Sequence, residues 1–173
     1  MDSAPNTIGY GEFEGIVAEL HRIPETGRKA FRARLRVMRD GGIPSVASPG
    51  KGARVSYRFE DLWETHLALH LEQFGLPLER VRFVINEEAR KCHWFNLMRD
   101  CEQKHSCDAW IFMEHLRFHA GARDAERSAY GVIVPSEQLA EVIRFHDVRA
   151  MVYAIINLSR LTRECESAFQ KAG

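Results

Sequence analysis

The chain has 173 residues, of which 45% are hydrophobic, and its 24 Lys and Arg balance 24 Asp and Glu. A chain of this length and hydrophobicity can bury a core, which excludes a wholly disordered protein. No apolar run approaches the roughly 18 to 20 residues that span a bilayer, and the N-terminus lacks an apolar signal core, so we expect a cytoplasmic protein.

The overall charge balance hides a strongly basic segment. Between Arg22 and Arg58 there are ten bases and two acids, a net charge of +8, whereas the remaining fourteen bases and twenty-two acids give −8. Concentrated positive charge is typical of polyanion binding, because neutralising phosphates releases condensed counterions. The basic segment therefore indicates where a polyanion would bind.

The first half of the chain reads as helices around one β-hairpin. Apolar residues recur at helical spacing, and the tip Ser48-Pro49-Gly50-Lys51-Gly52 is typical of a tight turn. After a flexible segment 1–9, we expect helices at about 11–22, 27–40 and 60–75, a hairpin over 43–59, and a helix from Leu76-Pro77 to about residue 103.

The second helix has two distinct faces. At about 100° per residue, Phe31, Leu35 and Met38 form a narrow stripe that we expect to be buried. Arg34 lies apart from the other bases, and we interpret it as a phosphate or intramolecular contact. One contiguous face, at about 60° to 160° from Phe31, holds five bases: Arg28, Lys29, Arg32, Arg36 and Arg39.

The second half has a mixed pattern. The run 150–156 fits a strand or a helix, and we favour a strand. We also expect strands at 109–118 and 129–134 and helices at 136–145 and 158–170. We therefore divide the chain into a domain 10–86, a connecting helix 87–106, and a small α+β module 107–173 for dimerisation or partner binding.

The order helix, turn, basic helix, hairpin and two further helices resembles a winged helix-turn-helix, and specifically the MerR-type transcription regulators, over about residues 10–85. The motifs that carry the resemblance are Leu35-Arg36 followed after five residues by Gly42-Ile43, the wing Gly52-Ala53-Arg54-Val55-Ser56-Tyr57 before Glu60-Asp61-Leu62, and Phe74-Gly75-Leu76. The resemblance implies that Arg36 enters or flanks the major groove, and that Arg54 and Tyr57 grip phosphates.

General chemistry agrees with these roles. An α-helix fits the major groove of B-DNA, and arginine can bind the guanine edge through two hydrogen bonds. Backbone amides and a cation at a Gly-Lys-Gly tip can approach the sugar–phosphate chain. We expect base reading by Lys29, Arg32 and Arg36, and phosphate binding by Arg28, Arg39, Lys51, Arg54, Tyr57 and Arg58.

Other kinds of site have weaker support. The basic face can also be read as an ordinary solvated surface. Cys92 and Cys101, nine residues apart, would point to opposite sides of a helix, so the group they form with His105 and Cys107 does not suit a compact metal site. The sequence has no nucleophile elbow, phosphate-binding loop or dinucleotide glycine pattern, so we predict neither an enzyme nor a bound cofactor.

These patterns together predict a mainly helical α+β protein that binds double-stranded DNA as a homodimer through the C-terminal module and connecting helix. We expect a sequence-specific transcription regulator associated with the nucleoid and the transcription machinery. The alternative is an architectural or phage-type accessory DNA-binding factor, or a partner-recruiting adaptor, without direct promoter regulation. A third hypothesis is a ligand sensor.

Overall fold

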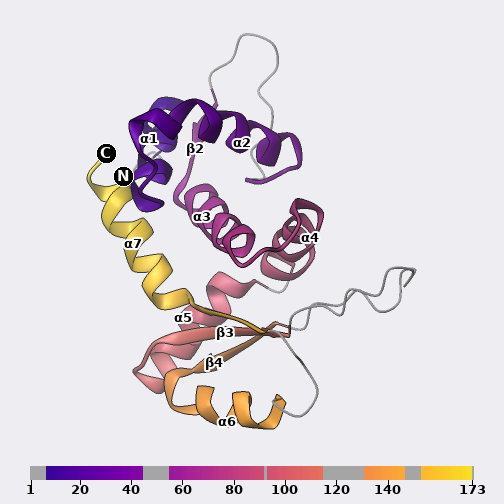
Figure 1. Cartoon of the computed structure of the whole chain (residues 1–173). Coiled ribbons are helices and arrows are strands. Elements are labelled where there is room, and N and C mark those ends of the chain that lie inside the picture. Colours follow the sequence, from indigo (N-terminus) through magenta and orange to yellow (C-terminus); the bar gives the residue numbers. More distant parts are fainter. Residues whose placement is uncertain (1–6, 45–54, 92, 115–130, 147–152, 173) are drawn as a thin grey trace, which may run out of the picture. The chain divides into compact units, whose positions relative to one another are not determined.

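The computed structural model of the chain describes residues 7–44, 55–91, 93–114, 131–146 and 153–172. It confirms a mainly helical α+β protein with small antiparallel sheets (Figure 1). The chain divides into two compact units. The first unit combines Met1–Ile85 with Leu161–Gly173, and the second consists of Asn86–Arg160.

The first unit is built mainly from helices. Its first helix begins after Gly9, whose backbone N–H donates to the carboxylate of Glu12 at 2.9 Å, and its buried residues include Phe13 and Val17. The elements of this unit are β1 (Ile8–Gly9), α1 (Tyr10–Leu20), a 3-10 turn (Glu25–Gly27), α2 (Arg28–Asp40), β2 (Ser56–Tyr57), α3 (Phe59–Gln73), α4 (Leu78–Phe83) and, from Leu161 onward, α7 (Leu158–Gln170).

The short sheet of this unit differs from the predicted hairpin. Ile8 pairs with Tyr57 and Gly9 with Ser56, in antiparallel register. The return strand of the hairpin is therefore paired with the segment before α1, and residues 45–54 lie outside the described residues. Because Ile8 is only 3% exposed, the prediction of a flexible segment 1–9 is wrong for residues 8 and 9.

The helix predicted from residue 76 to 103 is interrupted. A π-helical stretch, Val84–Arg90, follows α4, and α5 (Trp94–His105) begins after His93, which has a positive φ of 52°. The apolar spacing continues across the break because the residues before it are buried in the core of the first unit and those after it in the core of the second. Val81 is buried in the first unit, whereas Trp94 and Met98 are buried in the second.

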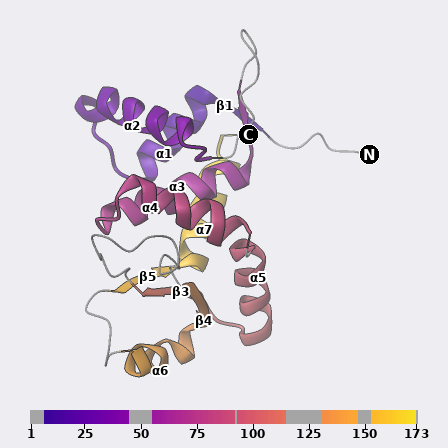
Figure 2. The ribbon, with the colours of Figure 1, turned by 90° about the vertical axis from the view of Figure 1, so that its right-hand side faces the viewer.

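The second unit contains a three-stranded antiparallel sheet in the order β4-β3-β5 (Figure 2). Ile111, Phe112 and Met113 of the central strand are all buried. Because successive residues of a strand point to opposite faces, both faces of this strand are covered. The elements are α5, β3 (Ala109–Glu114), β4 (Gly131–Pro135), α6 (Ser136–His146) and β5 (Tyr153–Asn157). The strand predicted over 150–156 is confirmed for residues 153–156, and residues 150–152 lie outside the described residues.

The last helix changes the predicted division of the chain. Trp63 Nε1 on α3 donates to Thr162 Oγ1 on α7 at 2.9 Å, and this hydrogen bond is buried. Residues from Leu161 onward therefore belong with the first unit rather than with a module 107–173. In the described part of the chain, no helix has both the length and the hydrophobicity needed to cross a membrane.

Candidate nucleic-acid interface

Helix α2 buries one narrow stripe and exposes the rest of its surface. Phe31, Leu35 and Met38 are 8%, 5% and 0% exposed. This confirms the predicted stripe, which fixes the rotation of α2 about its axis. The side chains at larger angles from the stripe must therefore face outward.

Three bases form an exposed ridge on α2. Lys29, Arg32 and Arg36 are all exposed, and their spacing of three and then four residues places them on one helix face. We call these three residues the basic ridge. Arg28 and Arg39 lie closer to the buried stripe and are half-buried. Among these five bases, the exposure of the side chain therefore increases with its angle from the stripe.

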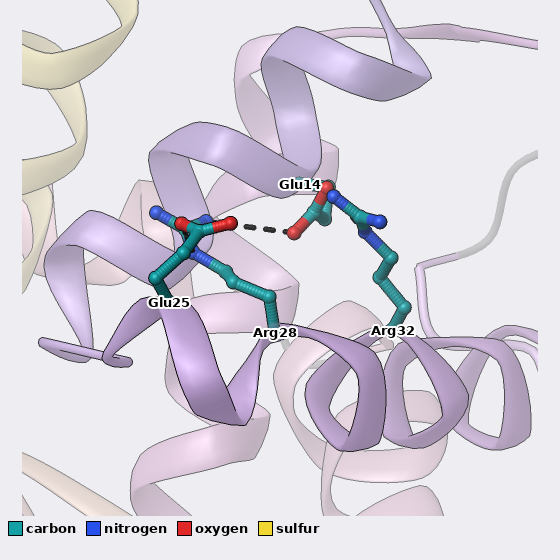
Figure 3. Close-up of polar contacts among 4 residues, drawn as sticks. All are labelled: Glu14, Glu25, Arg28 and Arg32. Carbon is teal, nitrogen blue, oxygen red and sulfur yellow. Dashed lines mark hydrogen bonds and ion pairs between the residues drawn. The ribbon is translucent and has the colours of Figure 1, made fainter.

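A buried acid on α1 holds two of the α2 arginines (Figure 3). The carboxylate of Glu14 accepts hydrogen bonds from Arg32 Nε at 2.9 Å and Arg28 Nη1 at 3.4 Å. Glu14 is 6% exposed, whereas the Arg32 side chain remains 57% exposed. Arg28 also lies 3.8 Å from Glu25. The pairings restrict where these guanidinium groups can lie, and Arg32 keeps a solvent-facing side.

The remaining bases of α2 divide between paired and unpaired groups. Arg34 forms a two-pronged ion pair with Glu72 on α3, including an Nε–Oε2 hydrogen bond of 2.9 Å. This confirms its interpretation as an intramolecular contact. Within the described residues, neither Lys29 nor Arg36 has an acidic partner. These two charges are therefore the ones most available to an anionic ligand.

The C-terminal end of α2 is held against α4. Arg82 Nη2 donates to the Val37 carbonyl at 3.2 Å, where the helix dipole favours a cation. A Cβ on Gly41 would lie 1.8 Å from Arg82 Nε, so a larger residue at this position would require the Arg82 guanidinium to move. Gly42 follows with a φ of +80°, which confirms the predicted end of the helix at the Gly41-Gly42 pair.

The burial of Tyr57 argues against the phosphate-binding role predicted for it. Its side chain is 1% exposed, and its ring stacks on Phe13 with centroids 4.0 Å apart. Burial raises the pKa of Tyr57, and a hydrogen bond with Arg39 opposes that rise. A buried ring is poorly placed to contact a phosphate, whereas its stacking on Phe13 and its hydrogen bond with Arg39 make Tyr57 part of the core.

Two variants of Tyr57 should separate the contribution of its ring to stability from the contribution of its hydroxyl. Tyr57→Ala is expected to lower the free energy of unfolding by about 3 to 5 kcal/mol, as for other buried aromatic residues. Tyr57→Phe keeps the stacked ring and should cost about 1 kcal/mol through the lost hydrogen bond. Urea unfolding measures both values. If Tyr57→Phe has normal stability but binds DNA tenfold more weakly, the result would support the predicted contact of the Tyr57 hydroxyl with a phosphate.

The other predicted phosphate contacts are only partly described. Arg58 is exposed, and its backbone N–H donates to Asp61 Oδ2 at 2.7 Å at the start of α3. Lys51 and Arg54 lie outside the described residues. The structure therefore brings together the basic ridge and Arg39 on one helix, and the phosphate role of Lys51 and Arg54 stays a prediction.

Sequence reasoning missed the two acids that organise this surface. Glu14 and Glu72 lie on α1 and α3, 14 or more residues from the arginines they bind. A helical wheel of α2 contains no information about either of them. The only local signal is the spacing of Glu14 within α1, where it follows the buried Phe13 and so lies at the edge of the buried face.

No known protein family model matches the chain, and no curated protein matches it significantly.

Proposed function

We propose that this chain is a sequence-specific double-stranded DNA-binding protein that acts as a dimeric transcription regulator. In this proposal the first unit is a winged helix-turn-helix domain of the MerR type, and α2 enters the major groove. The observation that carries the proposal is the basic ridge, an exposed row of Lys29, Arg32 and Arg36 on a helix whose opposite stripe is buried.

The chemistry of the ridge suits a duplex better than an unstructured polyanion. An α-helix fits the major groove, and arginine and lysine are the side chains that bind guanine O6 and N7. Glu14 limits the motion of Arg32, and a restricted side chain loses less entropy when it binds. The contact of Arg82 with the end of α2 likewise supports a rigid reading helix.

The proposed dimer would use the second unit. Leu97 on α5 and Val132 on β4 are 46% and 44% exposed, and β4 is an edge strand of its sheet. Exposed apolar side chains, and a strand edge that no other described strand pairs with, are both features that a second copy of the chain could cover. Palindromic sites bound by such a dimer would place two half-sites about one helical turn apart.

Selection of bound fragments from genomic DNA tests the proposal. The purified chain should enrich a small set of promoter-proximal fragments that share paired half-sites, and binding should weaken steeply as salt rises. Enrichment of scattered A·T-rich fragments would favour the architectural alternative, because such proteins recognise groove shape and flexibility. Failure to retain duplex DNA at low salt would refute DNA binding altogether.

A further inference from the structure

Three histidines of the first unit lie together at a place separate from the basic ridge. His66 and His70 lie one turn apart on α3, and His21 follows the last residue of α1. One ring nitrogen from each histidine can be chosen so that all three lie within 4.8 Å of one another. We propose that His21, His66 and His70 bind a divalent transition-metal ion of the zinc class.

The spacing of the rings is close to that of a metal site. His66 Nδ1 and His21 Nε2 are 2.8 Å apart, and the ring centroids of the three pairs are 4.6 to 5.1 Å apart. Two nitrogens each about 2.0 to 2.1 Å from zinc in a tetrahedral site lie roughly 3.3 Å from each other. The closest pair therefore needs to open by only about half an ångström to admit the ion.

Neighbouring polar groups can orient the ligands. His66 Nε2, the nitrogen that does not face His21, lies 3.5 Å from Glu164 Oε2 on α7. Gln73 Nε2 lies 3.2 Å from His21 Nδ1, and its side chain also hydrogen-bonds to His70. A metal-bound histidine usually donates its other N–H to a carboxylate, carbonyl or water. Glu164 is placed to accept such a hydrogen bond from His66. Gln73 presents its amide nitrogen to His21 Nδ1, so its amide group would have to turn over to accept through Oε1.

One atom of the cluster lacks a partner in the metal-free arrangement. His66 Nε2 is buried and, among the described residues, has no hydrogen bond, although the Glu164 carboxylate lies 3.5 Å away. Binding of a metal at Nδ1 would place the proton on Nε2 and strengthen its attraction to the carboxylate. The buried orphan atom thus becomes part of a carboxylate–histidine–metal arrangement.

The three imidazole rings are also in the protonation state that can bind a metal ion. Burial, reinforced by the neighbouring histidines, lowers the pKa of His66 to about 2 and that of His21 to about 4. Burial also lowers the pKa of His70. All three rings are therefore neutral at pH 7, which is the form that binds metals. Imidazole ligands favour zinc, copper, nickel or iron over magnesium or calcium.

Zinc titration of the full chain, freed of any affinity tag and treated with chelator, tests the proposal by calorimetry. We expect one zinc ion per chain. Because His21 and His70 are only half-buried, His21→Gln and His70→Gln should fold, and each should weaken zinc binding at least tenfold. Glu164→Gln should weaken it about 10- to 100-fold, the usual effect of removing a group that orients a ligand.

A control variant and a spectroscopic measurement show whether zinc binds at the three histidines or elsewhere. His105→Gln removes a histidine of the second unit that pairs with Glu137, and it should leave zinc affinity unchanged. In imidazole 15N NMR of the wild-type chain, zinc should shift three of the eight histidines and leave the other five in place. Absence of binding, or shifts confined to other histidines, would mean that the cluster is only a hydrogen-bonded chain of neutral rings.

Discussion

A chain that ends at Arg160 should lose the cooperative unfolding transition of the first unit, although residues 1–85 remain intact. The removed segment supplies four buried side chains: Leu161, Thr162, Cys165 and Phe169. Each large apolar side chain contributes about 1.5 to 3 kcal/mol by burial, out of a typical total stability of about 5 to 15 kcal/mol. Circular dichroism and hydrogen exchange of α1 to α3 would measure the loss.

Two contacts explain why the loss should be this large. Removing Thr162 leaves the buried Trp63 Nε1 without its acceptor, and an orphaned buried donor costs about 1 to 3 kcal/mol. Removing Phe169 uncovers Phe59, whose ring meets it edge-on at 6.0 Å. A chain that ends at Gln170 keeps all of these contacts and should behave like the full chain. Equal stability of the two truncated chains would contradict the prediction.

Arg36→Ala should weaken binding to the selected DNA site by about 1 to 3 kcal/mol, and binding to random DNA much less. Arg36 is the exposed arginine of the ridge that has no acidic partner among the described residues. It can therefore make both of its hydrogen bonds to a guanine edge without breaking an ion pair. Fluorescence anisotropy with the selected and random duplexes would measure the difference.

Arg34→Ala is the matched control for this variant. It removes the same charge from the same helix, but Arg34 lies off the ridge and pairs with Glu72. Its loss should leave discrimination between selected and random DNA unchanged. Because the Arg34 side chain is 43% exposed, its screened ion pair should cost at most about 1 kcal/mol of stability. Equal loss of affinity on both duplexes in Arg36→Ala would exclude base reading by that residue.

Local periodicity predicted most of the helices and the orientation of α2, but it did not show the break between α4 and α5. The burial of Phe31, Leu35 and Met38 depends on a helical repeat that is visible within 8 residues of sequence. The exposed ridge followed from the same repeat. These features were predictable because the residues that set the periodicity and the residues that are buried or exposed all lie on the same helix.

Pairings between distant segments could not be predicted in the same way. The sheet of the first unit joins Ile8–Gly9 to Ser56–Tyr57, and two-residue strands are too short to show alternation. The contact of Trp63 with Thr162 spans 99 positions. A hydrogen bond of this kind leaves no periodic signal, so the last helix was assigned to the wrong unit.

In both candidate sites, the features within one helix were visible in the sequence, whereas the contacts between helices were not. The ridge was predicted, but the acids that hold Arg28 and Arg32 come from another helix. In the histidine cluster, the spacing of four residues between His66 and His70 is a local signal for two ligands on one helix face. The third ring, His21, is 45 residues away from His66, and only the packing of α1 against α3 brings it close.

The composition of the first unit from two separate segments also sets an order of events during synthesis. Residues 86–160, the whole second unit, are synthesised before the α7 residues that Trp63 and Phe59 contact. The core of the first unit therefore cannot be completed until the whole second unit has been synthesised. Until α7 is made, α3 lacks the partners of Trp63 and Phe59, so an incomplete nascent chain would present the proposed DNA-reading surface on a unit whose core is unfinished.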